Sequence, residues 1–146
     1  MKKQPTTKDG FSRGRHVVHA LHAHLVFVSK YRRGVFTSGM LTDMEGVMSM
    51  VCSDMGATLV EFNGETNHVH LLVYYPPTLA ISRLVNALKG VSSRYLRKHH
   101  RPALKGKLYG DHLWSPSYFA GSVGGASLEA VKHYIQQQER PLSSPA

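Results

Sequence analysis

The order of strand-like and helix-like segments is the feature that most constrains the fold of this chain. In some segments apolar and polar residues alternate, as in a strand, and in others the apolar residues repeat at helical spacing. The expected strands cover residues 17–29, 57–62, 67–75 and 113–123, and the expected helices cover residues 38–55, 79–99 and 128–140. The first six segments have the order of a ferredoxin-like domain. We therefore predict an α+β fold: a ferredoxin-like (RRM-like) antiparallel sheet with helices on one face, plus a C-terminal helix.

Local signals place the ends of these elements. Asn63-Gly64 predicts a hairpin turn, because both residues tolerate a positive φ. Pro76-Pro77 should end the third strand, and Thr78 and Ser127 are suitable caps for the helix that follows each of them. A flexible joint at Gly124-Gly125 precedes the last helix. This helix could therefore dock on its own subunit or on a neighbouring one.

A chain of 146 residues suits one domain. We expect a basic flexible arm at residues 1–15, one main domain at residues 16–140 and a C-terminal tail at residues 141–146. A single cysteine, Cys52, excludes an internal disulfide and a cysteine-rich zinc finger. There is no apolar run long enough to span a membrane and no nucleotide-binding glycine loop. No apolar core follows the basic start of the sequence, so we expect no signal peptide. We expect a cytoplasmic protein with neither a membrane nor a nucleotide cofactor as partner.

Positive charge is concentrated in one part of the chain. The net charge is +9, and no acidic residue occurs between Glu65 and Asp111. Such a stretch attracts phosphate and releases counterions on binding, so we expect a nucleic acid partner. The alternative is a solvated helix face followed by a basic loop. The predicted phosphate contacts, on the second expected helix and mostly off its apolar stripe, are Arg83, Lys89, Arg94 and Arg97.

Two histidines interrupt an otherwise apolar strand. His68 and His70 are two residues apart, so their imidazoles share one face, whereas Val69, Leu71 and Val73 point to the other. The apolar set can pack against the helices, which leaves the histidines on the open side of the sheet, as two ligands of one cation would lie. The spacing also fits a purely structural pair. Further histidines with similar spacing are His16, His19, His22 and His24.

The last expected helix carries a second pair of polar residues. Tyr134 and Gln138 are four residues apart and would share one helix face. An amide oxygen is a hard ligand suited to magnesium or manganese, and two histidines fit manganese better. A tyrosine beside such a cation could attack a phosphate, because the cation would neutralise the developing charge. Both residues are equally compatible with packing of an amphipathic helix, and spacing does not bring them to the histidines.

A series of short motifs, spread over about residues 16–140, matches one known family. The matching stretches are residues 25–32, 35–36, 68–77, 89–90, 93–94, 113–114, 117–119, 122–124 and 134–138. Together they resemble the HUH single-tyrosine (TnpA-like) transposases of small bacterial insertion sequences, which move as single-stranded DNA. HUH stands for His, a bulky hydrophobe and His. One departure is the turn before the histidine pair, which is Glu65-Thr66-Asn67 here and of a Pro-Asp type in many relatives.

The resemblance implies a role for each matching residue. His68 and His70 match the metal-binding pair of the family, Gln138 its third ligand and Tyr134 its nucleophile, with Mg²⁺ or Mn²⁺ as the cofactor. It implies cleavage and rejoining of single-stranded DNA at insertion-sequence ends, through a 5′-phosphotyrosine intermediate and a released 3′ hydroxyl. It also implies recognition of subterminal hairpins, and a homodimer whose active sites can combine residues of both subunits.

Three other functions are compatible with some of these residues. A domesticated relative would use the same site as a hairpin-specific nuclease at chromosomal repeats. A ferredoxin-like RNA-binding module would stack bases on rings such as Tyr74 and Tyr75, although Tyr74 shares the face of the histidine pair. A zinc hydrolase would need a third histidine ligand, which the sequence does not identify.

Overall fold

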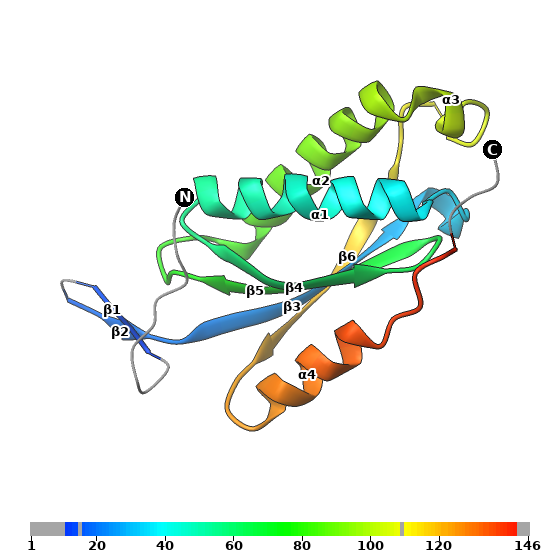
Figure 1. Cartoon of the computed structure of the whole chain (residues 1–146). Helices are drawn as coiled ribbons and strands as arrows, with labels where there is room; N and C mark the ends of the chain where they lie inside the picture. Colours follow the sequence, from blue (N-terminus) through cyan, green and yellow to red (C-terminus); the bar gives the residue numbers. More distant parts are fainter. Residues whose placement is uncertain (1–10, 15, 109, 143–146) are drawn as a thin grey trace.

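Four antiparallel strands form the main sheet, in the order β4-β5-β3-β6. The computed structural model describes residues 11–14, 16–108 and 110–142. Helices α1 (Ser38–Asp54) and α2 (Ile81–His99) cover one face of the sheet, and α4 (Ser127–Gln136) lies on the other (Figure 1). This arrangement confirms the predicted ferredoxin-like α+β fold with an additional C-terminal helix. The remaining bounds are β3 (Leu21–Ser29), η1 (Lys30–Arg32), β4 (Thr58–Gly64), β5 (His68–Tyr75), α3 (Arg101–Leu104) and β6 (Trp114–Val123).

The hydrophobic core lies between the sheet and the helices α1 and α2. Alternation along the strands directs Leu25 and Phe27 of β3 and Leu71 of β5 into it. Met44 of α1 and Leu88 of α2 meet them from the helical layer, and all five side chains are fully buried. Burial stabilises the fold by roughly 1.5–3 kcal/mol for each such side chain. This layer therefore fixes the orientation of the strands that carry the histidines.

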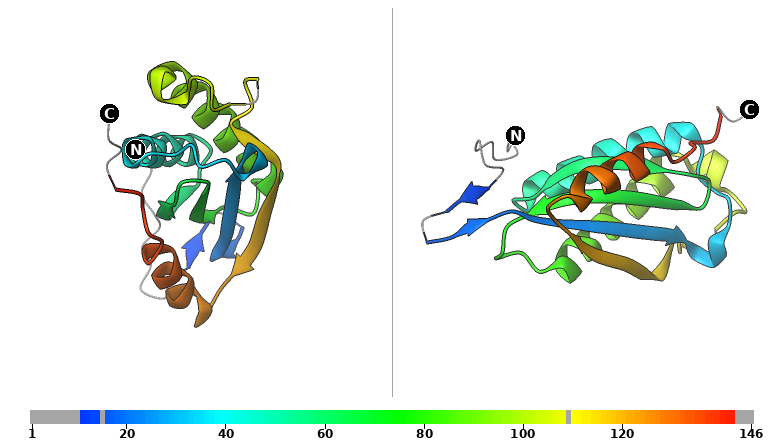
Figure 2. Two further views of the ribbon diagram at one scale, coloured as in Figure 1. Left: turned by 90° about the vertical axis from the view of Figure 1, so that its right-hand side faces the viewer. Right: turned by 90° about the horizontal axis from the view of Figure 1, so that it is seen from below.

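Pairing between β3 and β5 determines which side chains share the open face of the sheet. The register places Val26 opposite His70 and Val28 opposite His68. Since successive side chains of a strand alternate between the faces, His24 of β3 shares the face of the two β5 histidines. α4 lies across this face, on the opposite side of the sheet from α1 and α2 (Figure 2).

The predicted hairpin turn at Asn63-Gly64 is wrong, because both residues belong to β4. The connecting turn is formed by residues 65–67, and the Glu65 N–H donates to the His68 carbonyl at 2.9 Å. Gly64 serves close approach rather than a positive φ. A Cβ at this position would lie 2.6 Å from the His68 carbonyl oxygen of the paired strand.

The second long helix begins later than predicted. α2 starts at Ile81 with Ala80 as its N-cap, so Thr78 does not cap it. The Leu79 N–H donates instead to the Pro76 carbonyl at 3.1 Å. The residues between β5 and α2 therefore form a turn, which leads from the end of the strand into the helix.

The last helix is shorter than predicted. α4 begins at Ser127, whose hydroxyl donates to the Gly124 carbonyl at 2.7 Å, so Ser127 is not the N-cap. The helix ends at Gln136 rather than at residue 140. Gln138 therefore lies beyond it, and the expectation that Tyr134 and Gln138 share one helix face is wrong.

A short hairpin precedes β3, and only its first strand lies in the segment expected to be a flexible arm, residues 1–15. β1 (Ser12–Arg13) pairs antiparallel with β2 (Val18–His19). The Tyr74 hydroxyl of β5 ties this hairpin to the sheet through the Ser12 hydroxyl and, at 3.1 Å, the His19 carbonyl. The rest of the expected arm, residues 1–10 and 15, and residues 143–146 of the expected tail lie outside the described residues. None of the helices in the described part of the chain is long and apolar enough to cross a membrane.

Candidate active site

The imidazole of His68 is held in one tautomer by the turn that precedes it. Asn67 Oδ1 lies 2.8 Å from Nδ1 of His68. An amide oxygen can only accept a hydrogen bond, so the ring proton is on Nδ1. Nε2 then carries a lone pair, and it faces Oε1 of Gln138 at 3.2 Å. Two acceptor atoms in contact repel each other unless a proton or a cation lies between them, so this pair of atoms suits a metal ion.

The distance between these two atoms also fits a shared cation. Adjacent ligands of an octahedral Mg²⁺, with bonds of about 2.1 Å, lie about 3 Å apart, and His68 Nε2 and Gln138 Oε1 are 3.2 Å apart. The nitrogen of the Gln138 amide donates to the Tyr134 carbonyl at 3.4 Å, which turns the oxygen towards His68. Among the described residues, no three His, Cys, Asp or Glu side chains are grouped to hold a metal. A site at the histidine pair therefore needs the amide oxygen as its third protein ligand.

His70 is buried and uncharged. Its Nδ1 lies 2.9 Å from Nε2 of His24 on β3, and its ring is perpendicular to that of His68, with centroids 5.1 Å apart. Burial, and then repulsion by His24 and His68, lower the pKa of His70 to about 4. When its Nδ1–H donates to His24, the lone pair on Nε2 is left for a ligand. His24 suits the role of acceptor, because burial lowers its pKa as well.

Tyr134 projects from α4 beside the two histidines. Its ring is perpendicular to that of His70, with centroids 5.4 Å apart, and lies 6.3 Å from the ring of His24. Tyr134 is 52% exposed, whereas the next residue, Ile135, is fully buried. The buried side chain anchors the helix on the sheet, and the exposed phenol can meet a substrate from the solvent.

The segment after α4 is fixed by Asn63 of β4. The Asn63 amide donates to the carbonyls of Gln136 and Gln138, at 3.3 and 2.8 Å, and its oxygen accepts from Arg140 at 2.7 Å. Arg140 also forms an ion pair with Glu45 of α1 at 2.8 Å. These bonds hold the backbone on both sides of the Gln138 side chain, which explains how a residue outside the helix reaches the histidine pair.

The structure brings the four predicted site residues together within one subunit, namely His68, His70, Tyr134 and Gln138. Sequence reasoning missed two of their neighbours. Asn67 stood out only as part of an unusual turn, and His24 only as one of several scattered histidines. The alternation of the first strand puts His24 on the open face, but only the strand pairing identifies His70 as its neighbour.

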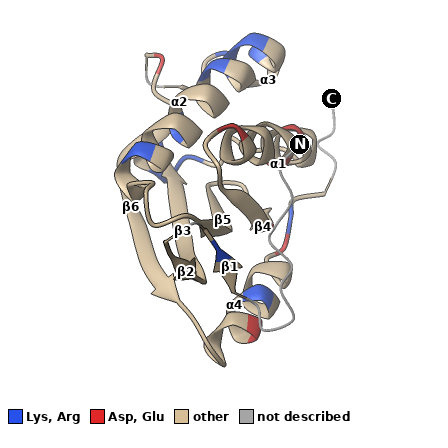
Figure 3. Ribbon diagram, turned by 90° about the vertical axis from the view of Figure 1, so that its left-hand side faces the viewer, with Lys and Arg blue, Asp and Glu red and all other residues tan. Residues whose placement is uncertain are grey.

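The predicted DNA contacts on α2 differ in their surroundings. Arg83 and Arg94 are exposed, and Arg97 is partly exposed. Lys89 differs from them, because its Nζ donates to the Ser115 carbonyl of β6 at 2.6 Å and burial lowers its pKa. Lys89 therefore fastens α2 to β6, in addition to any contact with DNA. Figure 3 shows that lysines and arginines recur along α2 and α3.

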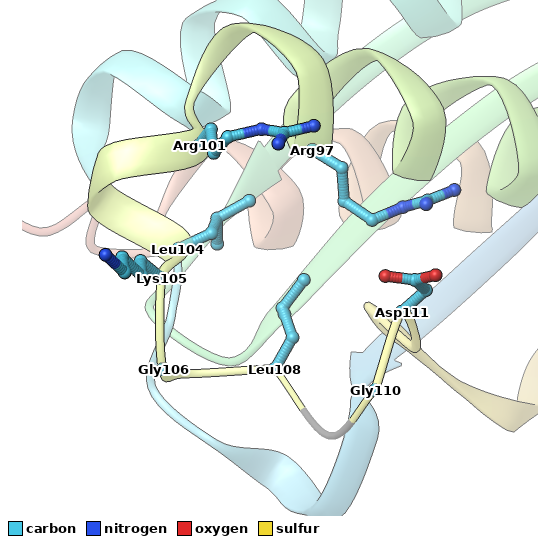
Figure 4. A pocket seen from close by; sticks show the side chains of 8 residues that line it. All are labelled: Arg97, Arg101, Leu104, Lys105, Gly106, Leu108, Gly110 and Asp111. Atoms are coloured by element: carbon cyan, nitrogen blue, oxygen red, sulfur yellow. The ribbon is translucent and has the colours of Figure 1, made fainter.

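A cavity of about 470 Å³ lies at the end of this basic helix (Figure 4). Arg97, Arg101 and Lys105 line it together with a single carboxylate, that of Asp111. α2 is on the opposite face of the sheet from α4, so this cavity is separate from Tyr134. It extends the positive surface of α2 rather than forming part of the histidine site.

Comparison with known proteins identifies the family. Residues 17–138 match the model of the family described as "Transposase IS200 like". The ISDra2 transposase TnpA of Deinococcus radiodurans is 32% identical over 126 residues, which cover 86% of this chain and 89% of that protein. The transposase for insertion sequence element IS200 of Salmonella typhimurium is 28% identical over 115 residues, which cover 79% of this chain and 74% of that protein.

Solved structures agree with this result. The crystal structure of a transposase candidate from Deinococcus radiodurans has a TM-score of 0.71 and 30% identity, and the match covers 88% of this chain and 98% of that one. A REP-associated tyrosine transposase bound to a REP hairpin has a TM-score of 0.56 at 13% identity, with 85% and 67% covered, and this likeness concerns the fold alone. The chain belongs to the IS200-like transposase family. Membership of this family implies a DNA-cutting and strand-transferring enzyme.

Proposed function

We propose that this transposase cuts and rejoins single-stranded DNA at insertion-sequence ends, with Tyr134 as its nucleophile. One observation carries the proposal. The ring of Tyr134 lies against His70, with centroids 5.4 Å apart, while Gln138 faces His68 at 3.2 Å. A phenol, two imidazoles and an amide oxygen are thus assembled on one face of the sheet, which is the set of groups that metal-assisted attack on a phosphate requires.

His68, His70 and Gln138 would hold one divalent cation, Mg²⁺ or Mn²⁺. When bound, the cation would polarise the scissile phosphate and neutralise the charge that develops on it. Asn67 fixes the tautomer of His68, which leaves the Nε2 lone pair of that ring available. His70 has a free Nε2 lone pair as well when its Nδ1–H donates to His24. Binding should release no proton from His70, because its low pKa keeps the ring neutral at neutral pH.

The phenol oxygen of Tyr134 attacks the phosphorus, and the bond from phosphorus to the 3′ oxygen breaks. The phenol loses its proton to the solvent, and the departing 3′ oxygen takes up a proton to become a hydroxyl. The 5′ phosphate remains on Tyr134 as a phosphodiester, so the energy of the cleaved bond is retained. A later attack by a 3′ hydroxyl on this phosphotyrosine rejoins the strands without a nucleotide cofactor.

The basic surface of α2 would bind the DNA outside the cleavage site. Arg83, Arg94 and Arg97 supply side chains for phosphate contacts, and the cavity beyond them adds further cations. A protein of the same fold has been solved with a REP hairpin. This supports a hairpin-bearing substrate for the present chain, as the family resemblance implies.

We also expect a homodimer, because the edge strand β6 offers a suitable surface. Within the described sheet β6 pairs only with β3, and Tyr118 and Phe119 of β6 are exposed. An exposed edge strand with aromatic side chains can pair with a second copy. The joint at Gly124-Gly125 follows β6 directly, so α4 could complete the site of either subunit. In this structure α4 lies on its own subunit.

Trapping the covalent intermediate tests the proposal. The protein is incubated with Mn²⁺ and single-stranded, hairpin-bearing oligonucleotides from the DNA that flanks its coding sequence, labelled at the 3′ end. We expect a labelled protein–DNA adduct on a denaturing gel. Tyr134→Phe should form no adduct yet bind the hairpin almost normally, since the arginines supply most of the affinity. The control Tyr118→Phe alters another exposed tyrosine and should form the adduct. Normal cutting by Tyr134→Phe would refute the mechanism.

A further inference from the structure

The ladder between β3 and β6 is interrupted beside the histidine pair. Phe27 pairs with Tyr118 and the next pair is Ser29 with Trp114, so residues 115–117 bulge opposite a single residue of β3. Pro116 lies inside this bulge and has no N–H with which to continue the ladder. β-bulges end pairing locally and are frequent next to active sites. Here the bulge separates the two strands at the surface.

A cavity of about 390 Å³ occupies this interruption. One wall is η1, with Lys30, Tyr31 and Arg32, and the other is the bulge of residues 115–117. The lining contains two cations and no carboxylate, so the cavity attracts anions such as a phosphate. The serine hydroxyls of the bulge add polar groups at its rim.

The backbone of η1 is strained. Tyr31 and Arg32 both have a positive φ, of 57° and 55°, which is unfavourable for residues with a Cβ. Such strain persists only where the surroundings impose it, and it is concentrated at functional sites. Here hydrogen bonds impose it. The Ser29 hydroxyl donates to the Arg33 carbonyl at 2.6 Å. The Lys30 N–H donates at 2.9 Å to the carbonyl of Leu113, the residue before β6.

This strained turn presents the ring of Tyr31 to the solvent. Tyr31 is 66% exposed, and the Lys30 ammonium lies 5.2 Å from the centre of its ring. An aromatic ring beside cations is the combination by which proteins bind single-stranded nucleic acid, because a base stacks on the ring and the cations meet the backbone. A fixed backbone favours this role, since the ring is already in place before DNA arrives.

The turn is directly connected to the histidine site. Val28, which lines the cavity, pairs with His68 in the β3–β5 ladder. The next residue, Ser29, donates its N–H to the Asn67 carbonyl at 2.9 Å. Asn67 is the residue whose side chain orients His68. A DNA strand with a phosphate at the histidine pair would therefore have a neighbouring nucleotide within reach of the cavity.

We propose that this cavity is a nucleotide-binding subsite for single-stranded DNA beside the cleaved phosphate. One base stacks on the ring of Tyr31, and Lys30 and Arg32 contact the adjoining phosphates. The proposal rests on the proposed function, because the position of the cleaved phosphate is taken from the histidine site.

Equilibrium binding in a Tyr134→Phe background tests the subsite without requiring cleavage. The probe is a hairpin-bearing single strand in which one nucleotide at a time is replaced by an abasic site, with affinity read by fluorescence anisotropy. We expect one position at which the abasic site weakens binding about 5- to 150-fold, the range for a stacked base. Tyr31→Ala should lose a similar factor with intact DNA and should no longer respond to that abasic site. Tyr31→Trp should retain both properties.

A second variant separates stacking from folding. Tyr31→Gly removes the ring and relieves the positive φ, so we expect a Tm at or above that of the parent, together with the affinity loss of Tyr31→Ala. Parental affinity of Tyr31→Ala, or an unchanged response to every abasic position, would overturn the subsite. If the wild-type protein, which retains Tyr134, formed no covalent adduct, the proposed chemistry would be overturned instead. The subsite would still be decided by the binding measurements.

Discussion

Acid should destabilise the metal-free protein through His70. Burial beside His24 and His68 lowers the pKa of His70 from 6.5 to about 4 in the folded state. The unfolded chain therefore binds a proton near pH 6.5, and the folded chain does so only near pH 4. Between these values the unfolded state binds more protons, so lower pH favours unfolding. The contribution of His70 to stability is therefore complete above pH 6.5, is lost progressively as the pH falls from 6.5 to about 4, and does not change further at lower pH.

The size of this effect follows from the two pKa values. One pKa unit corresponds to about 1.4 kcal/mol, so the difference between 6.5 and about 4 amounts to about 3 kcal/mol at most. His70 is only 6% exposed, so solvent screening removes little of it. The unfolding free energy of a small domain is about 5–15 kcal/mol. A single histidine would thus account for a measurable share of the acid sensitivity.

Urea unfolding in EDTA, followed by circular dichroism between pH 8 and pH 4, measures this effect. His70→Gln is the comparison, because glutamine keeps a polar group at the site but does not titrate. Between pH 7.5 and pH 4 the wild type should lose about 3 kcal/mol more than His70→Gln. His24 shifts in the same direction and remains in both proteins. Parallel stability profiles of the two proteins would show that His70 is not held neutral by the fold, and would refute the reasoning.

Three further predictions concern the parts around the histidine pair. Arg94→Ala, which removes one exposed arginine of α2, should reduce the slope of log DNA affinity against log salt concentration by about 1. A DNA affinity that does not depend on salt would exclude a role of this helix in DNA binding. His24→Leu should weaken Mn²⁺ binding, measured by the electron paramagnetic resonance signal of free Mn²⁺, by about tenfold or more. His24→Gln should retain it, because its amide oxygen can accept from His70. Asn63→Leu should lose about as much Mn²⁺ affinity as Gln138→Ala, and the double variant should lose no more, whereas additive losses would separate Asn63 from Gln138.

The fold could be predicted from the sequence because helical periodicity marks α2 and α4 clearly and the order of the elements allows few topologies. The wrong predictions concern positions where one local sequence signal can have two different physical causes. Asn63-Gly64 resembles a turn, but Gly64 is required by the close approach of β5, and Asn63 binds the segment after α4. The polar run after Ile135 is compatible with a longer helix, yet α4 ends at Gln136. The Asn63 side chain of β4 binds the carbonyls of Gln136 and Gln138 instead.

The candidate site was only partly predictable. Side chains alternate between the two faces of a strand, so strand geometry alone places His68 and His70 on one face of the sheet. The approach of Tyr134 and Gln138 depends on the docking of α4, which is fixed by the burial of Ile135 and by Asn63, and no local pattern encodes such a contact. The strained turn at residues 30–32 could not be predicted from a local pattern either, because its conformation is imposed by hydrogen bonds with distant parts of the chain.

Locating the covalent link by tandem mass spectrometry tests the central claim most directly. The adduct formed with Mn²⁺ and single-stranded hairpin DNA is digested with nuclease and protease, and the modified peptide is sequenced. We predict that the remaining nucleotide is attached through its 5′ phosphate to Tyr134. Attachment to another residue, or a link through a 3′ phosphate, would contradict the account.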